Sequence, residues 1–294
     1  MKLRFWGVRG SISVPGPDTV QFGGNTSCLQ ICEDNQPIII LDAGTGIRKL
    51  GLDILTNHKD KKDIHLLLSH THWDHIQGLP FFAPLYIPGY SVSIYGPVHY
   101  EKSLEQILDR QMEYTYFPVR VAELAAKISY HGLKEDTFKI GGITVRTKYL
   151  NHPVLCLGYR FEHGGKSITY CTDHEPYFNL FGETGVEDEE VKEVVAEQNR
   201  VFFDFIRGSD LLVLDTQYTE TEYPNRVGWG HGYTTHNMEI VSQCNIKRWA
   251  LFHHDPDRSD AAQKKIEEAL QEKGRAAKLD TEIFAAKEGM IIEV

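Results

Sequence analysis

The sequence predicts an α/β fold of four layers, in which two mixed β-sheets pack together and helices cover the outside. Two observations lead to this prediction. Short apolar runs alternate with glycine-rich turns along the chain, and helical patterns follow the strand-rich part of each half. The chain has 294 residues, and we find neither repeats nor a long linker, so we expect one domain over residues 1–294.

Strands and helices are predicted from local patterns. The clearest strand candidates are Leu3–Val8, Ile38–Leu41, Ile64–Leu68, Val92–Tyr95, Ile143–Leu150, Ser167–Cys171, Leu211–Leu214, Trp249–Phe252 and Met290–Val294. Helical patterns cover Leu104–Tyr114, Asp188–Ile206, Thr235–Cys244 and Ser259–Lys273. The last helix has the clearest boundaries, because Ser259 is a suitable N-cap and Gly274 is expected to end it. Its apolar stripe consists of Ile266, Ala269 and Leu270.

Two segments look inserted into this pattern. The first, near residues 81–118, is rich in aromatic residues and proline, and two interpretations stay open: a hydrophobic cap over the sheets or a wall that faces a ligand. The second, near residues 187–207, is an acidic helix that ends in the apolar cluster Val201–Ile206. We expect core packing for this cluster, with a dimer contact or a lid as alternatives.

Composition and charge disfavour several classes of protein. With 31 basic and 41 acidic residues the net charge is −10, which disfavours a large nucleic-acid partner because such partners are usually met by a basic face. No apolar run approaches the roughly 18 residues that cross a bilayer, and the first residues lack the apolar core of a signal peptide. The five cysteines contain no Cys-x-x-Cys pair. A reducing cytoplasm without membrane attachment is therefore expected.

The strongest chemical signal follows the predicted strand Ile64–Leu68. Residues 70–75 read His-x-His-x-Asp-His. His70 and His72 lie on one side of an extended segment, so both rings can converge on one cation, whereas Asp74 and His75 follow in the turn and can face a second cation. Imidazole and carboxylate ligands suit zinc, and manganese or iron are alternatives.

Three further ligand candidates directly follow predicted strands. They are His152, Asp173 and His253, and the Asp173 carboxylate could bridge two ions. The loops at the carboxyl ends of strands commonly gather functional groups in α/β folds. His254 is an alternative to its neighbour His253. The agreement of these positions with the first motif predicts one metal centre built from distant parts of the chain.

These motifs resemble those of the metallo-β-lactamase superfamily nearly from end to end. Leu41–Gly46 resembles the first motif of that family, in which the aspartate (Asp42 here) braces the metal loop without binding metal. The resemblance implies an αββα sandwich and two metal ions, and it favours His253 over His254, since the family ligand directly follows the strand. One ion would be held by His70, His72 and His152 and the other by Asp74, His75 and His253, with Asp173 between them.

Two features indicate a particular branch of this family. The third motif carries His152 in place of the cysteine that is common in antibiotic-hydrolysing members. Asp215 and His231 match an acid–histidine pair of the phosphodiesterase branch, which includes ribonuclease Z and cyclic-nucleotide phosphodiesterases. The carboxylate would favour the protonated imidazole, which can serve phosphate oxygens or the leaving group. A helix-capping histidine without a catalytic role is the alternative interpretation of His231.

The resemblance implies hydrolysis by a metal-bridging hydroxide that attacks phosphorus, with Asp74 orienting this nucleophile. We expect a small phosphodiester as substrate, with a cyclic nucleotide favoured, because the chain lacks the long basic arm with which ribonuclease Z grips transfer RNA. The first alternative is a nuclease that processes RNA 3′ ends. The second is a hydrolase of carboxylic esters, lactones or thioesters at the same metals. A homodimer is also expected by analogy with the family.

Overall fold

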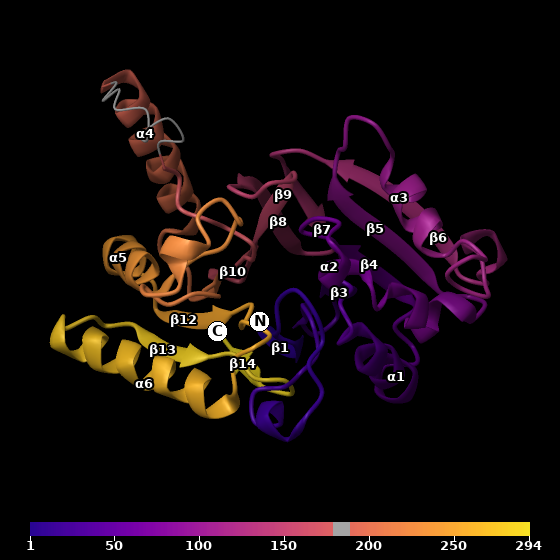
Figure 1. Ribbon diagram of the computed structural model, residues 1–294. Coiled ribbons are helices and arrows are strands. Elements are labelled where there is room, and N and C mark those ends of the chain that lie inside the picture. The colour runs from indigo at the N-terminus through magenta and orange to yellow at the C-terminus, as the bar shows by residue number, and fades with distance from the viewer. Residues whose placement is uncertain (179–188) are drawn as a thin grey trace.

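Two β-sheets form the centre of the computed structural model, which describes residues 1–178 and 189–294 (Figure 1). The first sheet contains β1 (Lys2–Gly7), β2 (Cys28–Cys32), β3 (Ile38–Leu41), β4 (Asp63–Leu67), β5 (Ser91–Pro97), β6 (Lys127–Leu133) and β14 (Ile291–Glu293). The second contains β7 (Thr137–Ile140), β8 (Ile143–Leu150), β9 (Cys156–His163), β10 (Lys166–Cys171), β11 (Leu211–Asp215), β12 (Arg248–Phe252) and β13 (Glu282–Ala285). Their spatial orders are β14-β1-β2-β3-β4-β5-β6 and β13-β12-β11-β10-β9-β8-β7.

Both sheets are mixed, as predicted. Neighbours from β3 to β6 and from β10 to β13 are parallel. All other neighbouring pairs are antiparallel. The parallel strands require crossover connections, and several of these carry helices.

The described helices are α1 (Ile47–Asn57), α2 (Trp73–Ile76), α3 (Leu104–Gln111), α4 (Glu189–Ile206), α5 (Thr234–Cys244) and α6 (Asp260–Ala276). Short 3₁₀ helices are η1 (Pro17–Thr19), η2 (Leu79–Phe81), η3 (Ala83–Tyr86), η4 (Val121–Glu123) and η6 (Tyr223–Asn225). Among the residues that the structure describes, no helix is long and apolar enough to cross a bilayer.

Three apolar cores define the layers. The central core lies between the sheets and joins side chains from both, such as Phe5 of β1 and Phe161 of β9. A second core packs α1 and α3 on the outer face of the first sheet, and a third packs α4, α5 and α6 on the outer face of the second sheet. The predicted four-layer α/β sandwich is therefore confirmed.

The predicted elements match observed ones, with two helix ends corrected. The helix predicted to reach Tyr114 ends at Gln111. The last helix has the predicted Ser259 N-cap but continues through Gly274 to Ala276. Gly274 is buried, and a Cβ on it would lie 3.0 Å from Ile283 Cδ1, so this glycine allows close packing on β13 and does not end the helix.

The two segments that look inserted differ in character. Residues 81–118 include β5, an inner strand that pairs with both β4 and β6, together with α3. The segment near 187–207 forms α4, whose N-terminal part projects from the body of the molecule in Figure 1, while residues 187–188 lie outside the described part. Phe202 and Ile206 of this helix are buried against the second sheet, which confirms core packing for these two residues.

Candidate metal centre

The predicted ligands and catalytic residues meet at one edge of the two sheets, where β4, β8, β10, β11 and β12 end. Because these strands run in one direction within each sheet, the loops that follow them lie together. Their clustered side chains are His70, His72, Asp74, His75, His152, Asp173, Asp215, His231 and His253. Residues as distant in sequence as His70 and His253 thus form one site.

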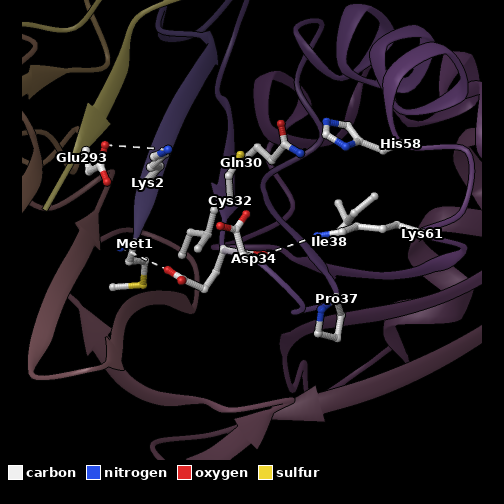
Figure 2. A pocket seen from close by; sticks show the side chains of 12 residues that line it. Met1, Lys2, Gln30, Cys32, Asp34, Pro37, Ile38, His58, Lys61 and Glu293 are labelled. Carbon is white, nitrogen blue, oxygen red and sulfur yellow. Dashed lines mark hydrogen bonds and ion pairs between the residues drawn. The ribbon is translucent and has the colours of Figure 1, made fainter.

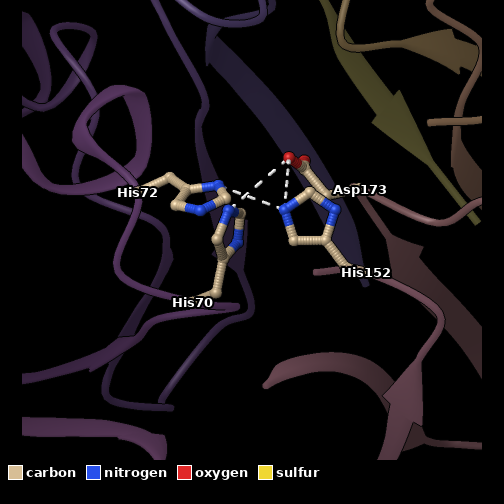
Figure 3. Close-up of side chains that lie close together, drawn as sticks. All are labelled: His70, His72, His152 and Asp173. Carbon is tan, nitrogen blue, oxygen red and sulfur yellow. Dashed lines mark hydrogen bonds and ion pairs between the residues drawn. The ribbon is translucent and has the colours of Figure 1, made fainter. Parts of the chain in front are cut away.

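The first cluster joins His70, His72 and His152 with Asp173 (Figure 3). His152 Nε2 lies 3.1 Å from His72 Nδ1 and 3.8 Å from Asp173 Oδ2, and His70 Nε2 lies 3.5 Å from the same oxygen. Ligands bound at about 2.0–2.1 Å around a tetrahedral zinc ion would be about 3.3 Å apart. His70 Nε2 is also buried without a hydrogen-bond partner in the described part of the chain. These residues fit a metal site.

The second cluster joins Asp74, His75 and His253, and the other oxygen of Asp173 faces it. His253 Nε2 lies 3.2 Å from Asp74 Oδ2 and 3.3 Å from Asp173 Oδ1. His75 Nε2 lies 3.3 Å from each of these two oxygens. Asp173 therefore presents one carboxylate oxygen to each cluster. His254 points elsewhere, with Nε2 2.9 Å from the Ala286 carbonyl oxygen.

The electrostatic environment suits cation binding. Burial lowers the pKa of His152 to about 4, and burial together with nearby His75 holds the pKa of His70 well below its usual value. Both rings are therefore neutral and can act as ligands. Burial also lowers the pKa of His75, but the carboxylates of Asp173 and Asp74 outweigh this effect and raise the pKa well above its usual value. Binding of a metal ion by His75 would require this ring to release a proton.

Asp42 supports the loop of residues 70–75, which we call the metal loop. It has a positive φ of 58° and is fully buried at the end of β3. Its Oδ1 accepts the Ser69 N–H at 2.7 Å, and its Oδ2 accepts the Tyr170 hydroxyl at 2.6 Å. The same Oδ2 lies 2.9 Å from His75 Nδ1, on the far side of that ring from the cluster. This geometry fixes the orientation of the His75 ring, as expected for a brace.

The segment Arg9–Ser11 also reaches the site, a role that local sequence patterns did not assign. The Ser11 N–H donates to Asp74 Oδ2 at 2.7 Å. A Cβ on Gly10 would lie 2.4 Å from His253 Cε1, so only glycine allows this approach. The buried Arg9 donates to the carbonyl oxygens of Gly23, Asp255 and Arg258, and thereby connects the first strand to the loop after His253.

The Asp215–His231 pair lies against both clusters. His231 Nδ1 is 2.8 Å from Asp215 Oδ2 and 3.9 Å from Asp173 Oδ2, and its ring stacks on that of His253 with centroids 4.9 Å apart. Burial by itself lowers the pKa of His231, but the Asp215 carboxylate outweighs this effect and raises the pKa to about 9. The ring is therefore protonated at neutral pH.

Three cavities differ in their relation to this centre. A cavity of about 520 Å³ borders the metal loop and is lined by Thr71, Trp73, Ile76, Ile107, Arg110, Gln111, Glu113 and Tyr116. A smaller one of about 160 Å³ lies at the N-terminal end of β1, where Lys2 faces Glu293 (Figure 2). No residue of the metal clusters lines the smaller cavity. A third cavity of about 310 Å³ is lined by the proposed ligand His152 together with Asn151, Pro153, Glu175, Tyr177, Phe178 and Gly228. The 520 Å³ cavity and this third one therefore both adjoin the centre.

Comparisons with known proteins agree with this geometry. A family model described as "Beta-lactamase superfamily domain" matches residues 38–254. A ribonuclease Z from Streptococcus agalactiae serotype V is 25% identical over 267 residues, covering 76% of this chain and 81% of the relative. The metallo-β-lactamase fold protein YhfI from Bacillus subtilis is 17% identical with a TM-score of 0.66, covering 99% of each chain. Unliganded yeast PDE1 is 14% identical with a TM-score of 0.68, covering 100% of this chain and 99% of that chain.

Proposed function

The chain belongs to the β-lactamase superfamily and is a metal-dependent hydrolase, and we propose that it hydrolyses a small phosphodiester. The observation that carries this proposal is the Asp215–His231 pair beside the two clusters. Asp215 occupies Nδ1 of the protonated ring, which leaves Nε2 to contact a substrate. A cationic donor in this place can bind phosphate oxygens or protonate the departing oxygen. An anionic phosphodiester is the substrate class that such a centre suits best.

We propose two divalent ions for the site, zinc in the first place and manganese or iron as alternatives. His70, His72 and His152 would hold one ion and Asp74, His75 and His253 the other, with Asp173 shared between them. When bound, the ions would activate a water molecule as nucleophile and neutralise phosphate charge. Asp74 is held by the Ser11 N–H, so its carboxylate is also placed to orient that water.

The cavity beside the metal loop supports a substrate with an aromatic base, and a cyclic nucleotide is the favoured case. Trp73 is 68% exposed and Tyr116 is 71% exposed, so neither residue is part of the apolar core. Both line the cavity together with Arg110. Aromatic faces stack on nucleobases, and a guanidinium can stack or donate hydrogen bonds.

Replacing Trp73 with alanine should therefore impair the substrate that carries a base. We expect kcat/KM for thymidine 5′-(p-nitrophenyl phosphate) to fall about 10-fold, since stacking is worth roughly 1–3 kcal/mol per base. The value for methyl p-nitrophenyl phosphate, which has the same leaving group and no base, should stay unchanged. Tyr100, which is 97% exposed and lies outside the cavity lining, provides the control variant Tyr100→Ala. Equal losses on both substrates would contradict a base-binding role.

A nuclease that processes RNA 3′ ends is the second candidate, and the ribonuclease Z relatives favour it. A panel of cyclic nucleotides, short RNAs with 3′ extensions, bis-p-nitrophenyl phosphate and thioesters separates the possibilities. We expect the metal-loaded protein to hydrolyse bis-p-nitrophenyl phosphate and cyclic nucleotides. Turnover of RNA alone would favour the nuclease, and turnover of thioesters alone would exclude phosphodiester hydrolysis.

We also propose a cytoplasmic location and a homodimer for this enzyme. The five cysteines, all free of disulfides, support the first proposal, because a reducing compartment keeps thiols in this state. The second rests on analogy with the family alone. Sedimentation of the purified protein would distinguish a dimer from a monomer.

A further inference from the structure

Glu175 is a buried carboxylate that lies two residues after Asp173 and outside the metal clusters. Its side chain is only 2% exposed. Three hydrogen-bond donors surround it. Oε1 accepts the Tyr223 hydroxyl and the Gly228 N–H, each at 2.8 Å, and Oε2 accepts the Gly230 N–H at 2.8 Å. All three donors belong to one loop, residues 223–231.

This loop carries two groups that face the metal centre. It ends at His231, and the carbonyl oxygen of Gly230 lies 3.0 Å from His152 Nδ1. Gly228 and Gly230 have φ values of 84° and 86°, which glycine adopts readily. A Cβ on Gly230 would lie 2.2 Å from His152 Nδ1, so the loop backbone packs directly on this ring. The position of the loop therefore decides how the His152 ring is oriented.

Glu175 also connects this loop to the segment that precedes His152. The Glu175 N–H donates to the Asn151 carbonyl oxygen at 3.0 Å, and the Asn151 N–H donates to His174 Nδ1 at 3.1 Å. The loops after β8, β10 and β11 thus meet at Glu175, whose backbone N–H bonds to the first and whose carboxylate bonds to the last. A carboxylate acceptor binds N–H and O–H donors more strongly than a neutral one, which suits a side chain that holds the 223–231 loop.

We propose that Glu175 is a positioning residue whose carboxylate fixes the 223–231 loop and thereby orients both His152 and His231. The catalytic and metal-binding roles of His231 and His152 rest on the proposed function. The contact by which Glu175 holds the loop does not depend on it. Both oxygens of Glu175 act as acceptors. A glutamine cannot replace it, because its NH₂ group would face an N–H or O–H donor at one of the two positions.

The test uses the full-length, metal-loaded Glu175→Gln variant. We expect amide exchange at Gly228 and Gly230 to become at least about 10-fold faster, because these N–H groups bond directly to the carboxylate. Resistance of the bound metal to a chelator and kcat should each fall about 10- to 100-fold, as is typical when a partner of a metal ligand is lost. Exchange in α6 should not change.

Glu267→Gln is the matched control. Glu267 Oε1 accepts the Ala285 N–H at 2.9 Å on the outer face of the second sheet, so this variant alters a similar bond away from the centre. We expect wild-type loop exchange and metal retention in this control. The proposal is overturned if Glu175→Gln keeps both quantities within about twofold of the wild-type values.

A second variant covers the case in which Glu175→Gln loses its fold, shown by faster exchange in α6 as well. Tyr223→Phe removes one donor but keeps the ring stacked on Tyr233, whose centroid lies 4.1 Å away. Faster exchange at Gly228 and Gly230 alone would support the proposal, and unchanged exchange would overturn it. Neither exchange nor metal retention requires a substrate. A wild-type protein that turns over no phosphodiester would therefore defeat the proposed function without deciding the role of Glu175.

Discussion

Replacing His231 with alanine is expected to lower kcat for phosphodiester hydrolysis by about 10²- to 10⁴-fold, the usual contribution of a general acid. The ring stands beside the two clusters, and Asp215 keeps it protonated, so its loss removes a cationic donor without removing a proposed ligand. The metal content should stay at the wild-type value. Steady-state kinetics together with metal analysis of the same preparation measure both quantities.

The pH profile and a matched variant sharpen this prediction. Since the pKa of His231 is raised to about 9, the donor is present below this pH and is lost as the pH rises through it. The wild-type kcat should therefore fall above about pH 9, and this limb should be absent in His231→Ala. His236→Ala is the control, because His236 stacks on Tyr233 and is not part of the clusters. Full turnover with full metal content in His231→Ala would exclude the role as donor.

Replacing Asp173 with alanine is expected to lower both the activity and the metal content. Its two oxygens face different clusters, so the substitution removes a proposed ligand from both at once. Loss of a residue that hydrogen-bonds to a metal ligand typically lowers metal affinity or activity about 10- to 100-fold. Loss of a shared ligand should therefore lower kcat by more than about 100-fold. Metal content should also fall, and elemental analysis after gel filtration measures this.

Asp210→Ala separates this effect from general destabilisation. Asp210 is a buried aspartate just before β11, where it accepts the Ser167 N–H at 2.8 Å and pairs with Lys247 at 2.6 Å. It makes no contact with the metal clusters. This variant should lose stability in urea unfolding but retain its metal. If Asp173→Ala retained a full complement of metal and activity, a shared ligand at this position would be excluded.

Some inner strands were predictable because their residues are almost all apolar. Ile38–Leu41 and Leu211–Leu214 are buried on both faces, so their sequences alone carry the signal. The strands that escaped prediction are the inner strands β2 and β9 and the edge strands β6, β7 and β13. In β6 and β7 exposed and partly buried residues alternate irregularly. Whether such a segment forms a strand depends on its pairing with a neighbouring strand, and the local sequence pattern does not contain this information.

The end of the last helix shows the same limit. Gly274 has the sequence character of a helix stop, but its contact with Ile283 of β13 makes it an interior residue of α6. Whether a glycine at this position ends the helix or continues it depends on the residues that pack against it. Tertiary packing therefore outweighed the local preference.

The sequence alone determined the fold class and predicted the side chains that we propose as metal ligands, because each of these follows a recognisable strand and the His70–His75 motif is compact. Only the tertiary structure decided that Asp173 faces both clusters, that Ser11 holds Asp74, and that Glu175 gathers the loop before His231. These contacts join residues far apart in the chain. They depend on how the sheets pack and where backbone N–H groups point, which residue identity and spacing do not encode.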